Sequence, residues 1–175
     1  MIIILAGPVH SGKTTFLQGV FSRWRDRDLG MRGFLSLAFW EGGERRGYDL
    51  LELEKGRTLP FLRTSGETDW ERIGPFYVIP ETLEAARSII LGASPDELLV
   101  VDEVGPLELG GGGLWPALDT VLKRPFIKTM LVVREGILDE FLTLLAGHRT
   151  VGLDIREKDL EIRLERLVAG AAART

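Results

Sequence analysis

The sequence predicts an α/β domain in which helices cover both faces of a mostly parallel β-sheet. Short apolar runs alternate with segments of helical periodicity along the chain, which is typical of a sheet built from strand–helix–strand units. Two runs, Leu98–Val101 and Thr129–Val133, lack the alternation of a half-exposed strand, which indicates strands buried on both faces. A β-hairpin inserted after the first helix is the expected departure from this order.

Composition and charge favour one soluble domain over residues 1–175. Apolar residues make up 45% and charged residues 27% of the chain, near the averages for globular proteins. The net charge is −4 and basic residues are scattered among acidic ones, so we expect no nucleic acid and no membrane partner. The chain has no cysteine and its apolar start, Met1–Ala6, is too short for a signal peptide, which favours the cytoplasm. Whether a protein partner exists is left open.

The first half of the chain reads as strand, helix, hairpin and loop. Helical spacing begins after Lys13 and closes near Gly30. The glycine pair Gly42 and Gly43 separates two strand-like runs and predicts the hairpin turn. The strands expected here are Met1–Leu5, Gly33–Trp40 and Tyr48–Leu53. The segment Lys55–Pro75 shows no period and is expected to be loop.

The second half alternates helices with strands. Pro80 and Glu81 mark the start of a helix that ends before Gly92. The helices expected are Pro80–Leu91, Trp115–Leu122, Ile137–Leu145 and an amphipathic one containing Leu160, Ile162, Leu164 and Leu167. Besides the two buried runs, Thr150–Leu153 is expected to be a strand.

A glycine-rich loop carries the clearest chemical signal. The segment Gly7–Thr14 matches G-x-x-x-x-G-K-[ST] in full, after a predicted strand and before a predicted helix. Glycines let such a loop curl so that backbone N–H groups converge on phosphate oxygens at the helix N-terminus. The expected phosphate-binding residues are Gly7, Pro8, Val9, His10, Ser11, Gly12, Lys13, Thr14 and Thr15. A glycine turn with an exposed lysine is the alternative.

Two charged or polar side chains of this loop have expected roles of their own. The Lys13 ammonium would neutralise the β- and γ-phosphates. The Thr14 hydroxyl would be a ligand of Mg²⁺, the cofactor that this chemistry implies.

A second motif follows the buried strand Leu98–Val101. The strand runs directly into Asp102 and Glu103, which is the form of a Walker B segment. We expect Asp102 to hold the metal together with Thr14, and Glu103 to polarise the water that attacks the γ-phosphate. A solvated Asp-Glu turn is the alternative. Because the glutamate stands beside the metal aspartate, hydrolysis is favoured over transfer to a bound acceptor.

Weaker candidates lie near both motifs. Arg134 follows the strand Thr129–Val133, so its guanidinium is a candidate to offset charge at the γ-phosphate. A surface ion pair with Glu135 or another neighbour is the alternative. No specific role is expected for the His10 side chain, because such loops work through their backbone groups. The run Gly110–Gly113 is either a loop that orders on nucleotide binding or a plain connection.

Four aromatic residues are possible faces for a nucleotide base, although aromatic residues at strand positions usually pack in the core. They are Trp40, Tyr48, Trp70 and Phe76.

With both motifs in place, the chain resembles the small P-loop nucleoside-triphosphatase family first known from thermophiles, which includes the human cancer-related nucleoside-triphosphatase. The resemblance covers most of the chain and is strongest at Asp102–Leu109, which is similar to the family signature Asp-Glu-Ile-Gly-x-Met-Glu-Leu. It extends over Gly7–Thr15, Arg32–Phe34, Gly43–Asp49 and Gly74–Val78. The four glycines after Leu109 and the segment Lys128–Leu153 depart from it.

The resemblance implies a three-layer, RecA-like P-loop fold. It also implies slow Mg²⁺-dependent hydrolysis of several nucleoside triphosphates to diphosphate and phosphate, with broad base tolerance. A guanine-reading Asn-Lys-x-Asp motif is excluded, because the chain contains no asparagine. Glu108 belongs to the signature, and we expect it to support the adjacent loop.

Three functions compete at this point. The first is a nucleoside-triphosphatase that uses Lys13, Thr14, Asp102 and Glu103. The second is a small-molecule or nucleotide kinase, which would need an acceptor pocket and a lid such as Lys55–Arg72. The third is a nucleotide-dependent switch without catalytic turnover.

Overall fold

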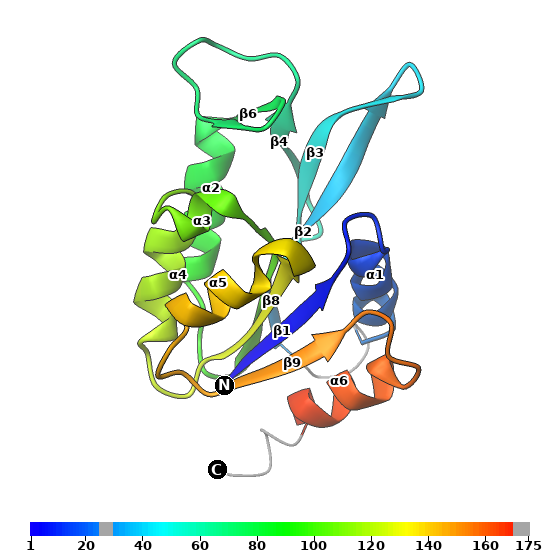
Figure 1. Ribbon diagram of the computed structural model, residues 1–175, viewed down its shortest axis with the longest axis vertical. Coiled ribbons are helices and arrows are strands. Elements are labelled where there is room, and N and C mark those ends of the chain that lie inside the picture. The colour runs from blue at the N-terminus through cyan, green and yellow to red at the C-terminus, as the bar shows by residue number, and fades with distance from the viewer. Residues whose placement is uncertain (25–29, 170–175) are drawn as a thin grey trace.

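A nine-stranded mixed sheet with helices on both faces forms the body of the protein (Figure 1). The computed structural model describes residues 1–24 and 30–169. The strand order is β5-β6-β4-β3-β2-β7-β8-β1-β9. The strands are β1 (Ile2–Gly7), β2 (Gly30–Glu41), β3 (Glu44–Glu52), β4 (Thr58–Arg63), β5 (Arg72–Ile73), β6 (Phe76–Val78), β7 (Glu97–Val104), β8 (Lys128–Arg134) and β9 (Thr150–Asp154). The predicted α/β class is confirmed.

Five neighbouring strands, β2, β7, β8, β1 and β9, are parallel. Strand β1 pairs with β8 and with the edge strand β9, so that Ile4 lies between Leu131 and Gly152. Residues 2–7 are all buried, and so are Leu98–Asp102 and Thr129–Val133. The absence of alternation in the sequence of these strands therefore does reflect cover on both faces.

The antiparallel part of the sheet is larger than the expected hairpin. The turn at Gly42 and Gly43, both with left-handed φ, joins β2 to β3 as predicted. However, β3 also pairs with β4, and β6 pairs with β4 and β5. The expectation that 55–75 is loop was therefore wrong for β4 and β5. In Figure 1 this extension stands above the helix-covered body.

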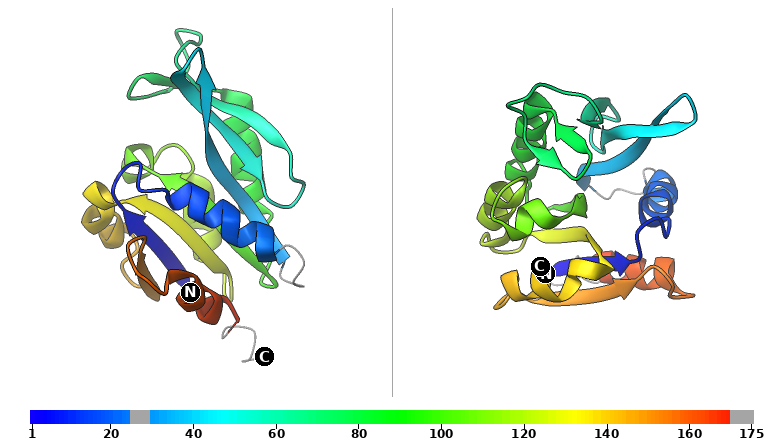
Figure 2. Two further views of the ribbon diagram at one scale, coloured as in Figure 1. Left: turned by 90° about the vertical axis from the view of Figure 1, so that its right-hand side faces the viewer. Right: turned by 45° about the horizontal axis from the view of Figure 1, so that its top comes forward.

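The helices form two layers, one on each face of the sheet. They are α1 (Lys13–Trp24), α2 (Pro80–Leu91), α3 (Pro106–Leu109), α4 (Trp115–Leu122), α5 (Leu138–Leu144) and α6 (Leu160–Ala169), with a 3₁₀ turn at Glu135–Ile137. One apolar cluster lies between the sheet and α1 and α6, and the other lies under α2, α4 and α5. Figure 2 shows α1 and α6 on the face opposite α2 and α4. The predicted three-layer arrangement is confirmed.

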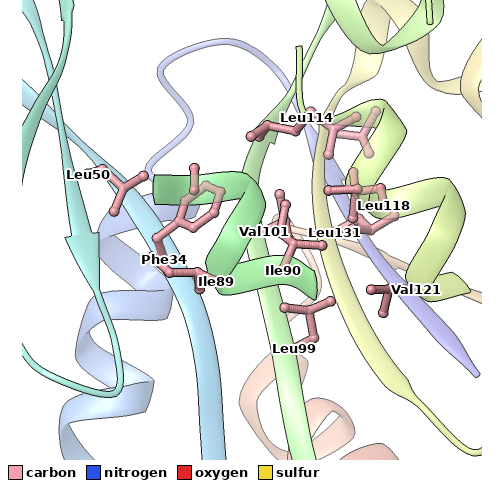
Figure 3. Close-up of a cluster of buried hydrophobic side chains, with 14 of the residues drawn as sticks. Phe34, Leu50, Ile89, Ile90, Leu99, Val101, Leu114, Leu118, Val121 and Leu131 are labelled. Carbon is pink, nitrogen blue, oxygen red and sulfur yellow. The ribbon is translucent and has the colours of Figure 1, made fainter. Parts of the chain in front are cut away.

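The sequence pattern of α2 and α4 explains how they cover their face of the sheet. In α2 the apolar residues recur three or four positions apart, and Ile89 and Ile90 pack toward Leu99 and Val101 of β7 (Figure 3). Each such fully buried aliphatic side chain contributes about 1.5–3 kcal/mol. Pro80 at the first turn of α2 and Gly92 after its end are the predicted boundaries.

One element boundary falls outside the described residues, and another differs from the sequence expectation. The first helix is described as far as Trp24, and its expected close near Gly30 falls on the boundary of residues 25–29, outside the described part of the chain. Gly30 itself is the first residue of β2, which pairs in parallel with β7 before it enters the hairpin. The hairpin is therefore the continuation of a core strand.

At Gly33 the strands β2 and β7 lie too close together for a side chain. A Cβ atom at Gly33 would lie 1.9 Å from the Val100 carbonyl oxygen, and the φ of +116° disfavours any other residue. We expect Gly33→Ala to lower the free energy of unfolding by about 3 kcal/mol in urea titration. Gly152→Ala in β9 is the control, since its Cβ would meet open space; it should be neutral or stabilise by up to about 1 kcal/mol. Equal effects of both substitutions would contradict this view.

Candidate active site

The glycine-rich loop lies where β1 ends and α1 begins. The first N–H groups of a helix have no partner within it, and α1 begins at Lys13, directly after the loop. His10 and Gly12 have left-handed φ values of 63° and 83°, which produce the curl that the motif predicts. The Lys13 ammonium donates hydrogen bonds to the carbonyl oxygens of Gly7 (3.0 Å) and Pro8 (2.7 Å). The side chain of Lys13 thus binds the backbone of its own loop.

The Asp102 carboxylate connects this loop to the centre of the sheet. Its Oδ2 accepts hydrogen bonds from the Thr14 hydroxyl (2.7 Å) and from the Ser36 backbone N–H (3.0 Å). Its Oδ1 is buried and accepts no hydrogen bond. Burial raises the pKa of Asp102 from 3.8 to about 6, although the two donors act in the opposite direction. The ionised Asp102 carboxylate therefore destabilises the fold, and one of its oxygens has no hydrogen-bond partner.

A β-bulge directs Glu103 away from Asp102. The register of β7 against β8 shifts between Val101 and Val104, and Glu103 has a left-handed φ of 64°. In a regular strand successive side chains alternate between faces, yet Val104 packs in the same cluster as Val101. The bulge re-aims the carboxyl end of the strand. A left-handed, non-glycine residue at this point is a strained feature of the kind that gathers at functional sites.

Arg134 pairs with Glu103 across two neighbouring strands. Its Nη2 lies 2.9 Å from Glu103 Oε2, whereas Glu135 pairs with Arg156 instead. Both partners are partly exposed, with side-chain exposures of 37% and 29%, so the pair itself contributes little to stability. Arg134 does form an ion pair, as the alternative interpretation expected, but its partner is the candidate catalytic carboxylate.

The charges of the motifs converge on the Lys13 ammonium. Partial burial lowers the pKa of Lys13, and the carboxylates of Glu103 and Asp102 act to raise it. Arg134 also acts on it, in the lowering direction. The structure thus brings Lys13, Thr14, Asp102, Glu103 and Arg134 together at one end of the parallel strands, where ligands of α/β sheets bind.

Glu108 supports the loop after β7, as expected. Its carboxylate accepts hydrogen bonds from the backbone N–H groups of Gly105 (2.8 Å) and Leu114 (2.9 Å). A Cβ atom at Gly113 would lie 2.3 Å from Glu108 Oε1. The run Gly110–Gly113 therefore passes close to the Glu108 carboxylate, where Gly113 leaves no room for a side chain. Burial raises the pKa of this carboxyl, and the two backbone donors partly offset the rise.

Sequence reasoning missed two contributors to the site. The Ser36 N–H that binds Asp102 is a backbone group and leaves no signal in the sequence. Arg45 on β3 reaches the glycine-rich loop, where its Nη1 lies 3.4 Å from His10 Nδ1. The sequence predicts the hairpin that carries Arg45, but it does not predict that Arg45 contacts the glycine-rich loop. Of the four aromatic candidates, Tyr48 and Phe76 pack edge to face with each other near the site, and Trp40 is exposed.

Comparison with known proteins identifies a family. A family model described as NTPase matches residues 2–163. The nucleoside-triphosphatase THEP1 of Thermofilum pendens is 32% identical over 131 residues, which cover 73% of this chain and 71% of the relative. THEP1 of Thermococcus kodakarensis is 29% identical over 178 residues, covering 95% and 93% of the two chains.

Solved structures agree with the fold. A human cancer-related nucleoside triphosphatase has a TM-score of 0.73 at 21% identity, covering 99% of this chain and 98% of that chain. THEP1 from Aquifex aeolicus has a TM-score of 0.71 at 17% identity, with 98% and 99% covered. In the described part of the chain, no helix is both long and apolar enough to span a bilayer.

The buried carboxylate predicts a pH-dependent stability difference. Because the pKa of Asp102 is raised on folding, the folded state loses stability as the pH rises from about 4 to about 6, and the loss persists above that range. The difference between 3.8 and about 6, at 1.36 kcal/mol for each unit of pKa, corresponds to about 3 kcal/mol. Asp102→Asn should therefore stabilise the ligand-free protein by about this amount at pH 8, and by much less at pH 4.

Urea unfolding in EDTA at both pH values measures the effect. Asp96→Asn is the control, because Asp96 is exposed in the loop before β7. An Asp102→Asn protein that unfolds at lower urea than the parent at pH 8 would contradict the expected cost of burial.

Proposed function

Since the chain belongs to the NTPase family, we propose that it is a Mg²⁺-dependent nucleoside-triphosphatase that hydrolyses several nucleoside triphosphates to diphosphate and phosphate. The observation that carries the proposal is the paired arrangement at the end of β7. There Asp102 binds the Thr14 hydroxyl of the glycine-rich loop, and Glu103 is turned toward Arg134. A cytoplasmic setting is supported by the complete lack of cysteine.

The triphosphate would lie along the glycine-rich loop. Backbone N–H groups of the loop, other than at Pro8, which has none, would offer donors at the start of α1. Lys13 would exchange its bonds to Gly7 and Pro8 for bonds to phosphate oxygens. The left-handed backbone of His10 and Gly12 supports this curved shape. Positive charge at this end of the loop thereby meets the β- and γ-phosphates.

Thr14 and Asp102 fit a Mg²⁺ ion. Both offer hard oxygen atoms, and Mg²⁺ is usually held through one or two carboxylates together with substrate phosphates. The buried Oδ1 of Asp102 accepts no hydrogen bond, which a nearby cation would explain. Bound there, Mg²⁺ would supply neutralisation of the charge on the phosphate oxygens. The Thr14 hydroxyl donates its proton to Asp102, so its oxygen lone pairs would be available to the metal.

Glu103 is the proposed general base. Its carboxylate would accept a proton from the attacking water, whose oxygen bonds to the γ-phosphorus as the diphosphate leaves. Arg134, released from Glu103, would stabilise charge on the transferred group. The bulge and the left-handed φ of Glu103 fix its direction, which is distinct from that of Asp102.

Broad base tolerance is supported by what the sequence lacks. The Asn-Lys-x-Asp device that reads guanine cannot be formed, since the chain contains no asparagine. Phosphate release from ATP, GTP, CTP and UTP with Mg²⁺ tests the proposal. We expect turnover on all four bases and none with EDTA. Tight nucleotide binding without phosphate release would instead favour the kinase or the switch.

Substitution of the proposed base separates binding from chemistry. Glu103→Gln keeps the size and one acceptor oxygen of the side chain but cannot take the proton, so we expect kcat to fall at least tenfold. Nucleotide affinity, measured by titration calorimetry, should change less than threefold. Glu135→Gln is the matched control, because this exposed carboxylate pairs with Arg156. Unchanged turnover in Glu103→Gln would remove Glu103 from its role.

A further inference from the structure

A cavity adjoins the proposed catalytic pair on the side of the antiparallel strands. Its volume is about 350 Å³, and its wall includes the glycine-rich loop, the end of β7, the hairpin and the strands β4 to β6. Glu103 and Arg134 form part of this wall. The cavity is therefore continuous with the place where the γ-phosphate is attacked.

One end of the cavity is polar and mainly basic. Arg45, Arg134 and His10 line it together with Glu103. The Arg45 guanidinium lies 5.3 Å from the centroid of the Tyr48 ring and 3.4 Å from His10 Nδ1. The other carboxylate of the wall, Glu108, already accepts hydrogen bonds from the Gly105 and Leu114 backbone N–H groups. The two guanidinium groups at this end therefore favour an oxygen-bearing, anionic group.

The rest of the cavity is apolar. Its wall is made by side chains of β4, β5, β6 and α2, and five of them carry the argument: Phe61, Leu62, Ile73, Phe76 and Leu83. Most small-molecule sites have this composition, in which an apolar wall takes the body of the ligand and a few polar groups fix its orientation.

The cavity is larger than the space that one attacking water molecule needs. One water molecule takes about 30 Å³ of liquid volume, so about 350 Å³ would serve a single attacking water poorly. The nucleotide does not account for it either. With the γ-phosphate held by Lys13 and by the Mg²⁺ that Thr14 and Asp102 would bind, an extended triphosphate chain carries the base away from Glu103. A second ligand explains both the size and the apolar wall.

We propose that this cavity binds a second small molecule, with an apolar body against β4 to β6 and an anionic head between Arg45 and Arg134. The proposal rests on the proposed function, because the position of the γ-phosphate is taken from it. The head of this ligand occupies the place of the attacking water beside Glu103. A bound ligand of this class therefore slows phosphate release without displacing the nucleotide.

The probe for this site is 8-anilinonaphthalene-1-sulfonate, which has an aromatic body and an anionic head and becomes fluorescent in apolar surroundings. We expect saturable binding of one molecule per chain, both without nucleotide and with a saturating non-hydrolysable triphosphate. The probe should lower kcat for phosphate release severalfold and leave KM for the nucleotide unchanged. Fluorescence reports binding even if the protein has no turnover, so failure here is distinct from failure of the proposed function.

Two adjacent arginines of β3 provide a matched pair. Arg45 lines the cavity, whereas Arg46 is exposed and pairs with Glu44. Arg45→Glu should weaken probe binding at least tenfold, and Arg46→Glu should leave it unchanged. Ile73→Glu, at a partly buried position of the wall, should also weaken it. Circular dichroism confirms that each variant is folded.

Three outcomes would overturn the proposal. One is the absence of saturable binding to the folded parent protein. Another is an equal loss of binding in Arg45→Glu and Arg46→Glu, which would mean that the probe responds to charge in general. The third is competition between probe and nucleotide, which would assign the cavity to the nucleotide itself.

Discussion

The buried Asp102 carboxylate is the constraint on which the arrangement of this protein depends. A charge removed from water must find polar partners, and Asp102 finds them on two other elements, Thr14 of α1 and Ser36 of β2. The glycine-rich loop, the central strand β7 and the base of the hairpin are therefore fixed relative to one another. Because the second oxygen accepts no hydrogen bond, the same burial leaves one acceptor oxygen unsatisfied.

Most of the parallel part of the fold could be predicted from the sequence, and most of the antiparallel part could not. Strands buried on both faces, such as Leu98–Val101, have an uninterrupted apolar sequence that distinguishes them. The strands β4, β5 and β6 have six, two and three residues. In the sheet, β4 pairs with β3, β6 with β4, and β5 with β6. Such short strands among glycines and prolines carry no period of their own.

The candidate site divides in the same way. The residues of the two motifs, such as Lys13 and Glu103, could be predicted because each motif is defined by its residue types and their spacing. The bulge between Val101 and Val104 and the pairing of Arg134 with Glu103 depend on how neighbouring strands align. Alignment is a property of the folded sheet, so no inspection of one segment at a time reveals it. The same holds for the cavity, whose apolar wall comes from elements far apart in the chain.

The hydrogen bonds that Lys13 makes to its own loop have a consequence for the heat of binding. Two carbonyl oxygens accept hydrogen bonds from the ammonium, so a nucleotide bound here would replace these partners. The enthalpy gained at this residue is then the difference between two sets of bonds. The left-handed backbone of His10 and Gly12 gives the loop its curved shape, so less conformational entropy would be lost on binding phosphate. Affinity for phosphate at this loop would therefore depend on preorganisation more than on the number of contacts formed.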